Sequence, residues 1–247
     1  MADPRVAWLH GAVIAHRGAH AAGQGGAIEN SPSAFAAAIS QNLAIECDVQ
    51  RTADGQAVVF HDPTLNRLTA ERGPIAARTA ADLTQIRLGD TPDTIPTLAA
   101  TLAQIAGQVP LLIEIKIPAG QPHITLCRAV ATALATYTGS HAVMSFDPRV
   151  PLWFARNHPT TPRGLILSDT PRRRFAALRR ALAMRLAQPH FLALDIRDLP
   201  NPFAARQRAK GLPLATWTVR DSESLARARQ HADAPIAEGP ALAEAQT

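Results

Sequence analysis

The sequence predicts an α/β protein with the fold class of a closed (β/α)8 TIM barrel that carries a small inserted cap segment after its second strand. Short apolar runs alternate with stretches of helical spacing about eight times, which favours parallel strands joined by helices. The length of 247 residues suits one such barrel. Most of the apolar runs also end in polar residues. In a barrel these residues form a ring at the carboxyl ends of the strands, whereas an open doubly wound sheet would gather its ligands at one switch point.

Eight apolar runs supply the predicted strands, with a further run at 57–60 treated as a hairpin extension of the second. The predicted strands are 12–15, 44–50, 110–116, 142–145, 164–167, 191–194, 214–219 and 233–237. The hairpin is indicated by the turn residues Asp54 and Gly55.

The first helix is expected at 32–41, because Ser31 is a good N-cap residue and Pro32 suits the first helical position. Further helices are predicted at 97–105, 124–135, 150–157, 172–186, 203–210 and 222–230. Residues 62–96 are polar and irregular apart from one short helix at 80–86, so we interpret them as the insertion. No shift in composition divides the chain, and residues 1–247 are therefore expected to form a single domain.

The helix at 172–186 combines basic and apolar residues. Its arginines are Arg172, Arg173, Arg174, Arg179, Arg180 and Arg185, and Phe175, Leu178, Leu182 and Leu186 lie on the opposite helical face. We interpret it as an amphipathic helix with solvated arginines, in preference to a binding patch.

The composition indicates a soluble globular protein, since 47% of the residues are hydrophobic and 18% are charged. The net charge of +5 is spread along the chain, so we predict no nucleic-acid partner. Cys47 and Cys127 lie within apolar or helical patterns and suit buried positions in a reduced compartment. The sequence shows no signal-peptide or transmembrane pattern. We therefore expect a cytoplasmic location without stable membrane insertion, and the sequence makes no prediction of oligomeric state.

Three carboxylates stand out in the predicted strands. Glu46 and Asp48 are two residues apart, so both side chains face the same side of their strand, and Glu114 occurs near the end of the next parallel strand. Buried carboxylates need a cation, and oxygen ligands without histidine or cysteine favour one divalent cation, Mg²⁺ or Ca²⁺, over zinc. The alternative is a buried ion network with Arg17 and Lys116, but three carboxylates on neighbouring strand ends favour the metal.

His16 and His61 each end an apolar run and should be presented at the same rim. Because imidazole titrates near neutral pH, such a pair can divide proton removal and proton donation between them. Arg17 and Lys116 add positive charge, as expected for a substrate that carries a phosphate. Trp217 near a strand end suits either the core or a substrate pocket.

In order along the chain, these residues resemble the glycerophosphodiester phosphodiesterases. The matching segments are Ala15-His16-Arg17-Gly18, Glu29-Asn30-Ser31, Glu46-Cys47-Asp48-Val49, His61-Asp62, Ile95-Pro96-Thr97-Leu98, Glu114-Ile115-Lys116, Ser145-Phe146 and Thr216-Trp217-Thr218-Val219. The resemblance implies a (β/α)8 barrel that hydrolyses small phosphodiesters, such as glycerophosphocholine or glycerophosphoethanolamine, to glycerol 3-phosphate and an alcohol.

The resemblance also implies roles for individual residues. It makes Glu46, Asp48 and Glu114 the metal ligands, His16 and His61 the catalytic acid/base pair, and Arg17 and Lys116 the phosphate contacts, with Glu29 and Trp217 as further substrate-binding residues. It assigns neither acid nor base to a particular histidine, and it leaves open whether water or the glycerol 2-hydroxyl attacks phosphorus. Two alternatives remain at this point: a lysophospholipase D-type enzyme with a larger lipid substrate, and a non-catalytic barrel that binds anions.

Overall fold

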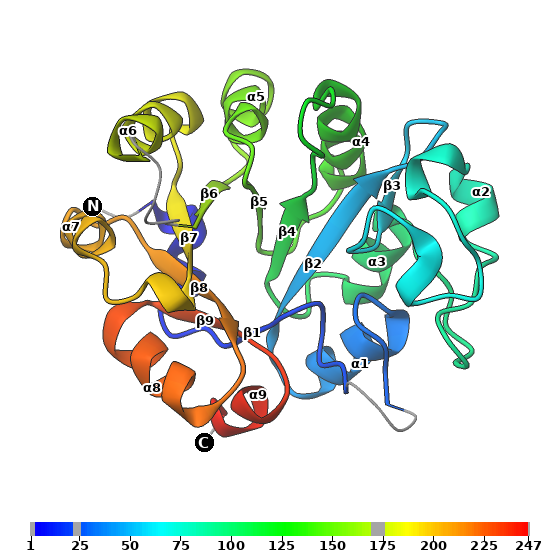
Figure 1. Cartoon of the computed structure of the whole chain (residues 1–247), viewed down its shortest axis with the longest axis horizontal. Helices are drawn as coiled ribbons and strands as arrows, with labels where there is room; N and C mark the ends of the chain where they lie inside the picture. The colour runs from blue at the N-terminus through cyan, green and yellow to red at the C-terminus, as the bar shows by residue number, and fades with distance from the viewer. Residues whose placement is uncertain (1–2, 22–25, 169–175, 247) are drawn as a thin grey trace. The chain divides into compact units, whose positions relative to one another are not determined.

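The computed structural model of the protein describes residues 3–21, 26–168 and 176–246, and Figure 1 labels its strands and helices. The strand order is β1-β9-β8-β7-β6-β5-β4-β2-β3, and β1 also pairs with β2. With helices between the parallel strands, this order confirms the predicted (β/α)8 barrel. The strands are β1 Ile14–Ala15, β2 Ala44–Arg51, β3 Ala57–Val59, β4 Leu111–Ile115, β5 His141–Ser145, β6 Arg163–Leu167, β7 Phe191–Asp195, β8 Leu214–Val219 and β9 Ala234–Ala237.

The helices follow the predicted order closely. They are α1 Pro32–Ser40, α2 Ala80–Leu83, α3 Leu98–Ile105, α4 Ile124–Leu134, α5 Arg149–Asn157, α6 Ala176–Ala187, α7 Pro202–Ala209, α8 Ser222–His231 and α9 Pro240–Glu244. Short 3-10 turns occur at Pro4–Leu9, Leu65–Arg67, Ile75–Ala77 and Ile196–Asp198. The predicted N-cap of α1 is confirmed, because the Ser31 hydroxyl accepts a hydrogen bond of 3.1 Å from the Ala34 amide.

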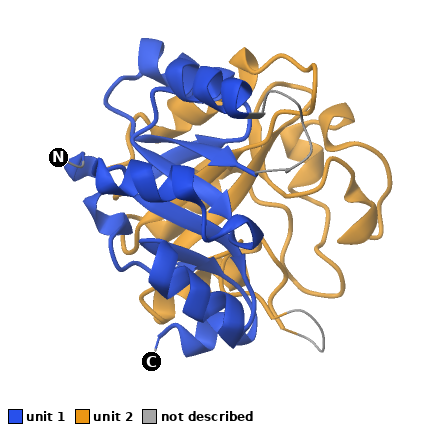
Figure 2. Cartoon of the chain, turned by 60° about the vertical axis from the view of Figure 1, so that its left-hand side comes forward, with its two compact units in different colours: residues 1–14, 141–247 blue, residues 15–140 orange. Residues whose placement is uncertain are grey.

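Two compact units make up the chain (Figure 2). Unit 2 comprises residues 15–140, and unit 1 comprises residues 1–14 together with 141–247. In unit 2, β2 pairs in parallel with β4 and antiparallel with β3, which confirms the predicted hairpin. In unit 1, strands β5 to β9 pair in parallel, each with its neighbour in sequence.

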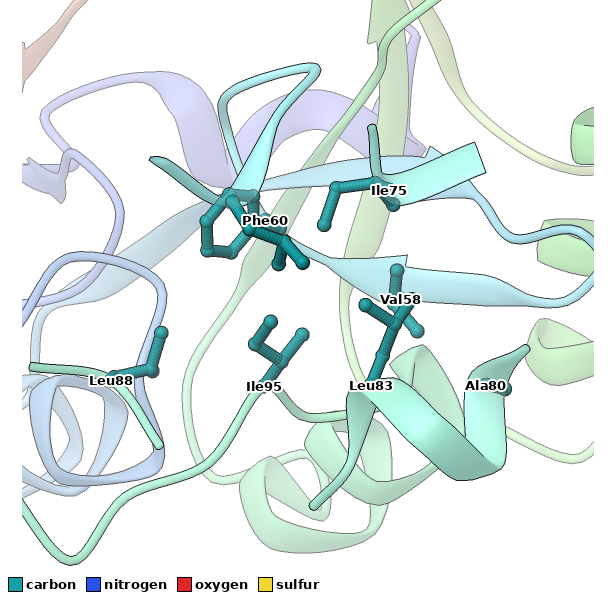
Figure 3. Close-up of a cluster of buried hydrophobic side chains, with 8 residues drawn as sticks. Val58, Phe60, Ile75, Ala80, Leu83, Leu88 and Ile95 are labelled. Atoms are coloured by element: carbon teal, nitrogen blue, oxygen red, sulfur yellow. The ribbon is translucent and has the colours of Figure 1, made fainter. Parts of the chain in front are cut away.

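The segment between β3 and α3, in unit 2, has an apolar core of its own, which the sequence pattern did not reveal. Figure 3 shows side chains from β3 and from this segment meeting in one cluster. The buried members are Val58, Phe60, Leu65, Ile75, Ala80, Leu83, Leu88 and Ile95. The predicted short helix is present as α2, but it covers only Ala80–Leu83. The cluster attaches the insertion to β3, just before His61.

The arginine-rich helix was expected to be amphipathic, with its leucines on the face that packs against the core, and this expectation was wrong. The helix is present as α6, and predicted residues 172–175 lie outside the described part. Leu178, Leu182 and Leu186 are 67%, 56% and 37% exposed, although an amphipathic helix should turn its apolar face to the core. The core side of α6 is formed instead by smaller or more flexible residues, including Ala183, Met184 and Ala187.

Candidate active site

The register between β2 and β4 places the predicted carboxylates side by side in unit 2. Asp48 is opposite Glu114 in the parallel pair, and Glu46 lies two residues earlier on the same side of β2. One oxygen from each of the three carboxylates lies within 4.8 Å of the others. Glu46 and Asp48 are each 1% exposed, and the Glu114 side chain is 12% exposed. The period-two spacing in the sequence therefore becomes a compact acidic cluster.

Two cations partly neutralise this cluster. The Lys116 ammonium lies 2.9 Å from Asp48 Oδ1 and 2.9 Å from Glu114 Oε1, and Arg17 Nε lies 3.2 Å from Asp48 Oδ2. Burial alone would raise the pKa of Asp48, but Lys116 and then Arg17, followed by His61 and His16, hold it well below its usual range. Asp48 is therefore ionised at neutral pH.

The neighbouring cations compensate the negative charges of Glu46 and Glu114 less fully than that of Asp48. Burial raises the pKa of Glu46 well above its usual range, and the neighbouring Asp48 and Glu114 raise it further. Burial and Asp48 also raise the pKa of Glu114 to about 7, against the opposing effect of Lys116. Three carboxylates face only two cations here, so full ionisation leaves one uncompensated negative charge.

These residues fit a divalent cation. Glu46 Oε2 accepts a hydrogen bond of 3.1 Å from the Arg17 amide, but Glu46 Oε1 is buried without a hydrogen-bond partner among the described residues. An unpaired buried carboxylate oxygen is costly, and it is the kind of ligand that Mg²⁺ and Ca²⁺ take. A dication would give the cluster a net charge of +1, which a phosphodiester monoanion would balance.

His61 is oriented by a chain of ion pairs. Its Nδ1 lies 2.7 Å from Asp62 Oδ1, and Arg67 binds Asp62 through Nε at 2.6 Å and Nη2 at 2.8 Å. Arg67 also binds both oxygens of Glu29, and Glu29 binds Arg17 Nη1 at 2.7 Å. Burial lowers the pKa of His61, with Lys116 and Arg17 contributing and Asp48 opposing. The lowered pKa favours the neutral ring, and the ion pairs fix its orientation.

His16 and Arg17 lie in a tight turn directly after β1. Arg17 has a φ of 58° and Gly18 a φ of 82°, and a Cβ at Gly18 would come within 2.9 Å of Ala34 on α1. The turn therefore requires glycine there. His16 is 7% exposed and contributes to the low pKa of Asp48, so the structure brings both predicted histidines close to the carboxylates.

Three residues of this site were not assigned a site role from the sequence. Asn30 donates from Nδ2 to Asp48 Oδ2 at 2.9 Å, and its Oδ1 accepts from the Asp48 amide at 3.2 Å. Gln50 donates to the carbonyls of His61 and Asp62, and Arg67 links Asp62 to Glu29. Of the three, only Asn30 had a signal in the sequence, because it belongs to the matching segment Glu29-Asn30-Ser31.

Trp217 belongs to unit 1 and lies on β8. Its ring makes an edge-to-face contact with Phe146, with ring centroids 5.4 Å apart and an interplanar angle of 84°. The indole Nε1 is buried and has no hydrogen-bond partner among the described residues. A buried donor without a partner suits a polar ligand, so a substrate-binding role for Trp217 stays a prediction.

A cavity of about 240 Å³ lies beside Lys116 in unit 2. Its lining includes Gln50 and Arg51 from β2, Pro63 and Pro74 from the insertion, and Ile117 and Pro118 after β4. It is smaller than the roughly 300–1,000 Å³ of pockets for drug-sized ligands. None of its lining residues carries a carboxylate.

The sequence profile of the glycerophosphoryl diester phosphodiesterase family matches residues 16–236, which span every residue of the acidic cluster and both histidines. The chain belongs to this family. It is 30% identical over 226 residues to the Bacillus subtilis protein YhdW, whose name assigns it to the glycerophosphodiester phosphodiesterases, and the match covers 87% of this chain and 88% of that protein. A Mycobacterium tuberculosis protein named as a probable glycerophosphodiester phosphodiesterase 1 is 26% identical over 239 residues, covering 87% and 84%.

Solved structures of family members agree with the fold. An Oleispira antarctica phosphodiesterase in complex with the product sn-glycerol-3-phosphate superposes with a TM-score of 0.82 at 26% identity, covering 95% of this chain and 96% of that one. A Silicibacter pomeroyi structure superposes with a TM-score of 0.82 at 22% identity, covering 98% and 96%, and supports the fold alone.

The family membership identifies the protein as a phosphoric diester hydrolase of the glycerophosphodiester phosphodiesterase type. Across the described residues, the helices are all too short or too polar to cross a bilayer.

Proposed function

We propose that this hydrolase converts glycerophosphodiesters, such as glycerophosphocholine and glycerophosphoethanolamine, to glycerol 3-phosphate and an alcohol, with the help of one divalent cation. The observation that carries the proposal is the acidic cluster of Glu46, Asp48 and Glu114 with its unpartnered Glu46 Oε1. These three side chains would hold Mg²⁺ or Ca²⁺. The bound cation supplies positive charge that stabilises the transition state of phosphoryl transfer.

The cations of the chain have a matching task. Arg17 and Lys116 are held at the cluster by Asp48, which supports their assignment to the phosphate oxygens. Their charge compensates the negative charge that grows on these oxygens as the new P–O bond forms and the old one breaks. Glu29 fixes the Arg17 guanidinium, and it is available to accept a hydrogen bond from a glycerol hydroxyl.

The two histidines divide the proton transfers. His61 is neutral and has its Nδ1 held by Asp62, so it is suited to accept the proton of the attacking hydroxyl, whether from water or from the glycerol 2-position. His16 then gives a proton to the departing alkoxide, which leaves as the neutral alcohol. Each proton removed from the nucleophile is thus balanced by one delivered to the leaving group. If the 2-hydroxyl attacks, a cyclic phosphate forms first; water then opens it to glycerol 3-phosphate, with the histidines in exchanged roles returning a proton to the 2-oxygen.

The cavity beside Lys116 supports a small leaving alcohol. Its volume of about 240 Å³ can hold a short alcohol beside a phosphate bound at Lys116. The lysophospholipase D alternative, with its longer acyl chain, is tested in the same assay as the proposed substrates.

The experiment measures hydrolysis of glycerophosphocholine, glycerophosphoethanolamine and lysophosphatidylcholine, with and without a chelator, for the natural protein and for Glu46→Gln and His16→Ala. We expect turnover of the two glycerophosphodiesters, its loss with chelator, its return with Mg²⁺ or Ca²⁺, and a fall of at least ~10²-fold in each variant. Circular dichroism should show both variants folded. Activity that survives complete chelation would refute the metal role, and activity on the lysolipid alone would refute the substrate assignment.

A further inference from the structure

Helix α6 uses only one of its faces to pack against the rest of unit 1. It lies beside α5 and β6 (Figure 1), with Ala187 buried and Ala183 and Met184 half-buried. Arg180 extends over the ring of Phe203 on α7, with its guanidinium carbon 4.4 Å from the ring centroid. These contacts attach the helix to the fold without using its leucines.

The opposite face of α6 carries a ridge of leucines in solvent. Leu178, Leu182 and Leu186 are spaced four residues apart, so they lie along one side of the helix. Ile124 and Phe146 are the other large apolar side chains classed as exposed in the described part of the chain, so three of these five belong to this ridge. Apolar surface concentrated in this way indicates an interaction site rather than scattered exposure.

Arginines flank the leucine ridge on both sides, contrary to the expectation that they lie on the opposite face. Arg179 and Arg185 are exposed, and neither side chain forms an ion pair or hydrogen bond with another described residue. The sequence of α6, Ala176–Ala187, contains no acidic residue. The face is therefore apolar along its centre and positively charged along its edges.

We propose that this face of α6 binds the surface of an anionic lipid bilayer. Leucines on such a helix enter the boundary between headgroups and acyl chains, while arginine side chains extend sideways to the lipid phosphates. With 12 residues the helix is too short to span a bilayer, so the association is peripheral and reversible. This surface belongs to unit 1 and shares no residue with the acidic cluster.

Other partners fit this face less well. A second copy of the chain would bring the same arginines together across a two-fold axis, and like charges at an interface disfavour association. A nucleic acid would satisfy the arginines, but the three leucines at the centre of the face would gain little from a phosphate backbone. An anionic bilayer provides both an apolar interior and a negative surface.

The experiment is flotation of the full-length protein with vesicles of phosphatidylcholine alone, or of phosphatidylcholine mixed with phosphatidylglycerol. We expect binding to the anionic vesicles that weakens at high salt, and little binding to the neutral ones. Arg179→Gln with Arg185→Gln should lower the partition coefficient about 30-fold, since each arginine near an anionic surface contributes roughly 1 kcal/mol. Leu178→Ser with Leu182→Ser should lower binding at least as much.

Matched controls separate this face from charge and apolarity elsewhere. Arg72→Gln with Arg87→Gln removes the same charge from exposed positions of the insertion, and Ile124→Ser removes an exposed apolar side chain on α4. Both should bind like the natural protein, and thermal melting should show all variants folded. Equal loss of binding in the control and α6 variants would overturn the proposal, as would absence of binding to anionic vesicles. A dimer in solution that the leucine variant abolishes would instead assign the face to a second copy.

Discussion

At the scale of single residues, Asp48 is the meeting point of the candidate active site. Its Oδ1 faces Lys116, and its Oδ2 faces Arg17 and accepts a hydrogen bond from Asn30. A buried carboxylate needs partners at both oxygens, and these three provide them. Asn30 is the neutral member of the set, so its contribution can be tested without changing the charge of the cluster.

Asn30→Ala is predicted to weaken divalent-cation binding about 10–100-fold, because groups that orient metal ligands typically contribute this much. Isothermal titration with Mg²⁺ and Ca²⁺ measures the change. Asn42→Ala is the matched control, since Asn42 also has a positive φ, of 54°, but is exposed. Both variants lose the preference of asparagine for this backbone conformation. Equal cation affinity in the two variants would contradict a role for Asn30 in positioning Asp48.

At the scale of elements, the insertion shows what the sequence pattern could not reveal. Its apolar residues, such as Leu65, Ile75 and Leu88, are far apart and follow neither a helical nor a strand period. They meet only because the segment folds back on itself and on β3 (Figure 3). Phe60 belongs to this cluster and directly precedes His61, so packing in the insertion fixes the strand end that carries a catalytic candidate.

Leu83→Ala is predicted to lower the free energy of unfolding by about 2–5 kcal/mol, because Leu83 is fully buried in the insertion cluster and its removal leaves a cavity. Urea denaturation measures the change. Leu178→Ala makes the same substitution at a helical leucine that is 67% exposed, and should change stability by at most ~0.5 kcal/mol. Similar losses in both variants would show that the insertion cluster contributes no special stability.

The difference between periodic strands and the irregular insertion explains how much of the candidate site could be predicted from the sequence. The period of two in β2 was enough to predict that Glu46 and Asp48 face one side, and strand order placed Glu114 beside them. Arg67 had no such signal, because its bond to Glu29 joins residues 38 positions apart through an irregular segment. The exposed leucines of α6 were misjudged for a related reason, since periodicity identifies an apolar face without saying whether the fold covers it.

At the scale of the whole molecule, the start of the chain is fixed to the second half of the sequence within unit 1. Arg5 donates to the carbonyls of Pro159 and Thr160 at 2.9 and 2.7 Å, and Asp3 binds Arg5. His190 lies in this cluster, where its Nδ1 accepts a hydrogen bond of 3.2 Å from the Arg163 amide. Burial lowers the pKa of His190 to about 4, with Arg163 and Arg5 contributing and Asp3 opposing.

This depressed pKa predicts a loss of stability on acidification. Between pH ~6.5 and ~4 the unfolded chain binds a proton at His190 while the folded protein does not, so stability falls as the pH falls through this window. Glu114 acts in the opposite direction. Its folded pKa of about 7 is above its ordinary value, so its ionisation costs stability as the pH rises. The informative quantity is therefore the difference in the free energy of unfolding between the natural protein and His190→Gln at each pH.

Urea midpoints measured from pH 4 to pH 7 with chelator present should show that His190→Gln loses part of the acid sensitivity of the natural protein. The free energy of unfolding of the natural protein should exceed that of His190→Gln by most near pH 7 and by least near pH 4. Only the natural protein has to keep a histidine neutral at this position when it folds, and this costs more free energy as the pH falls. The change with pH is limited to ~1.4 kcal/mol per unit, the value for a single proton. A stability difference that stays constant across this range would mean that His190 does not titrate differently in the folded and unfolded chains.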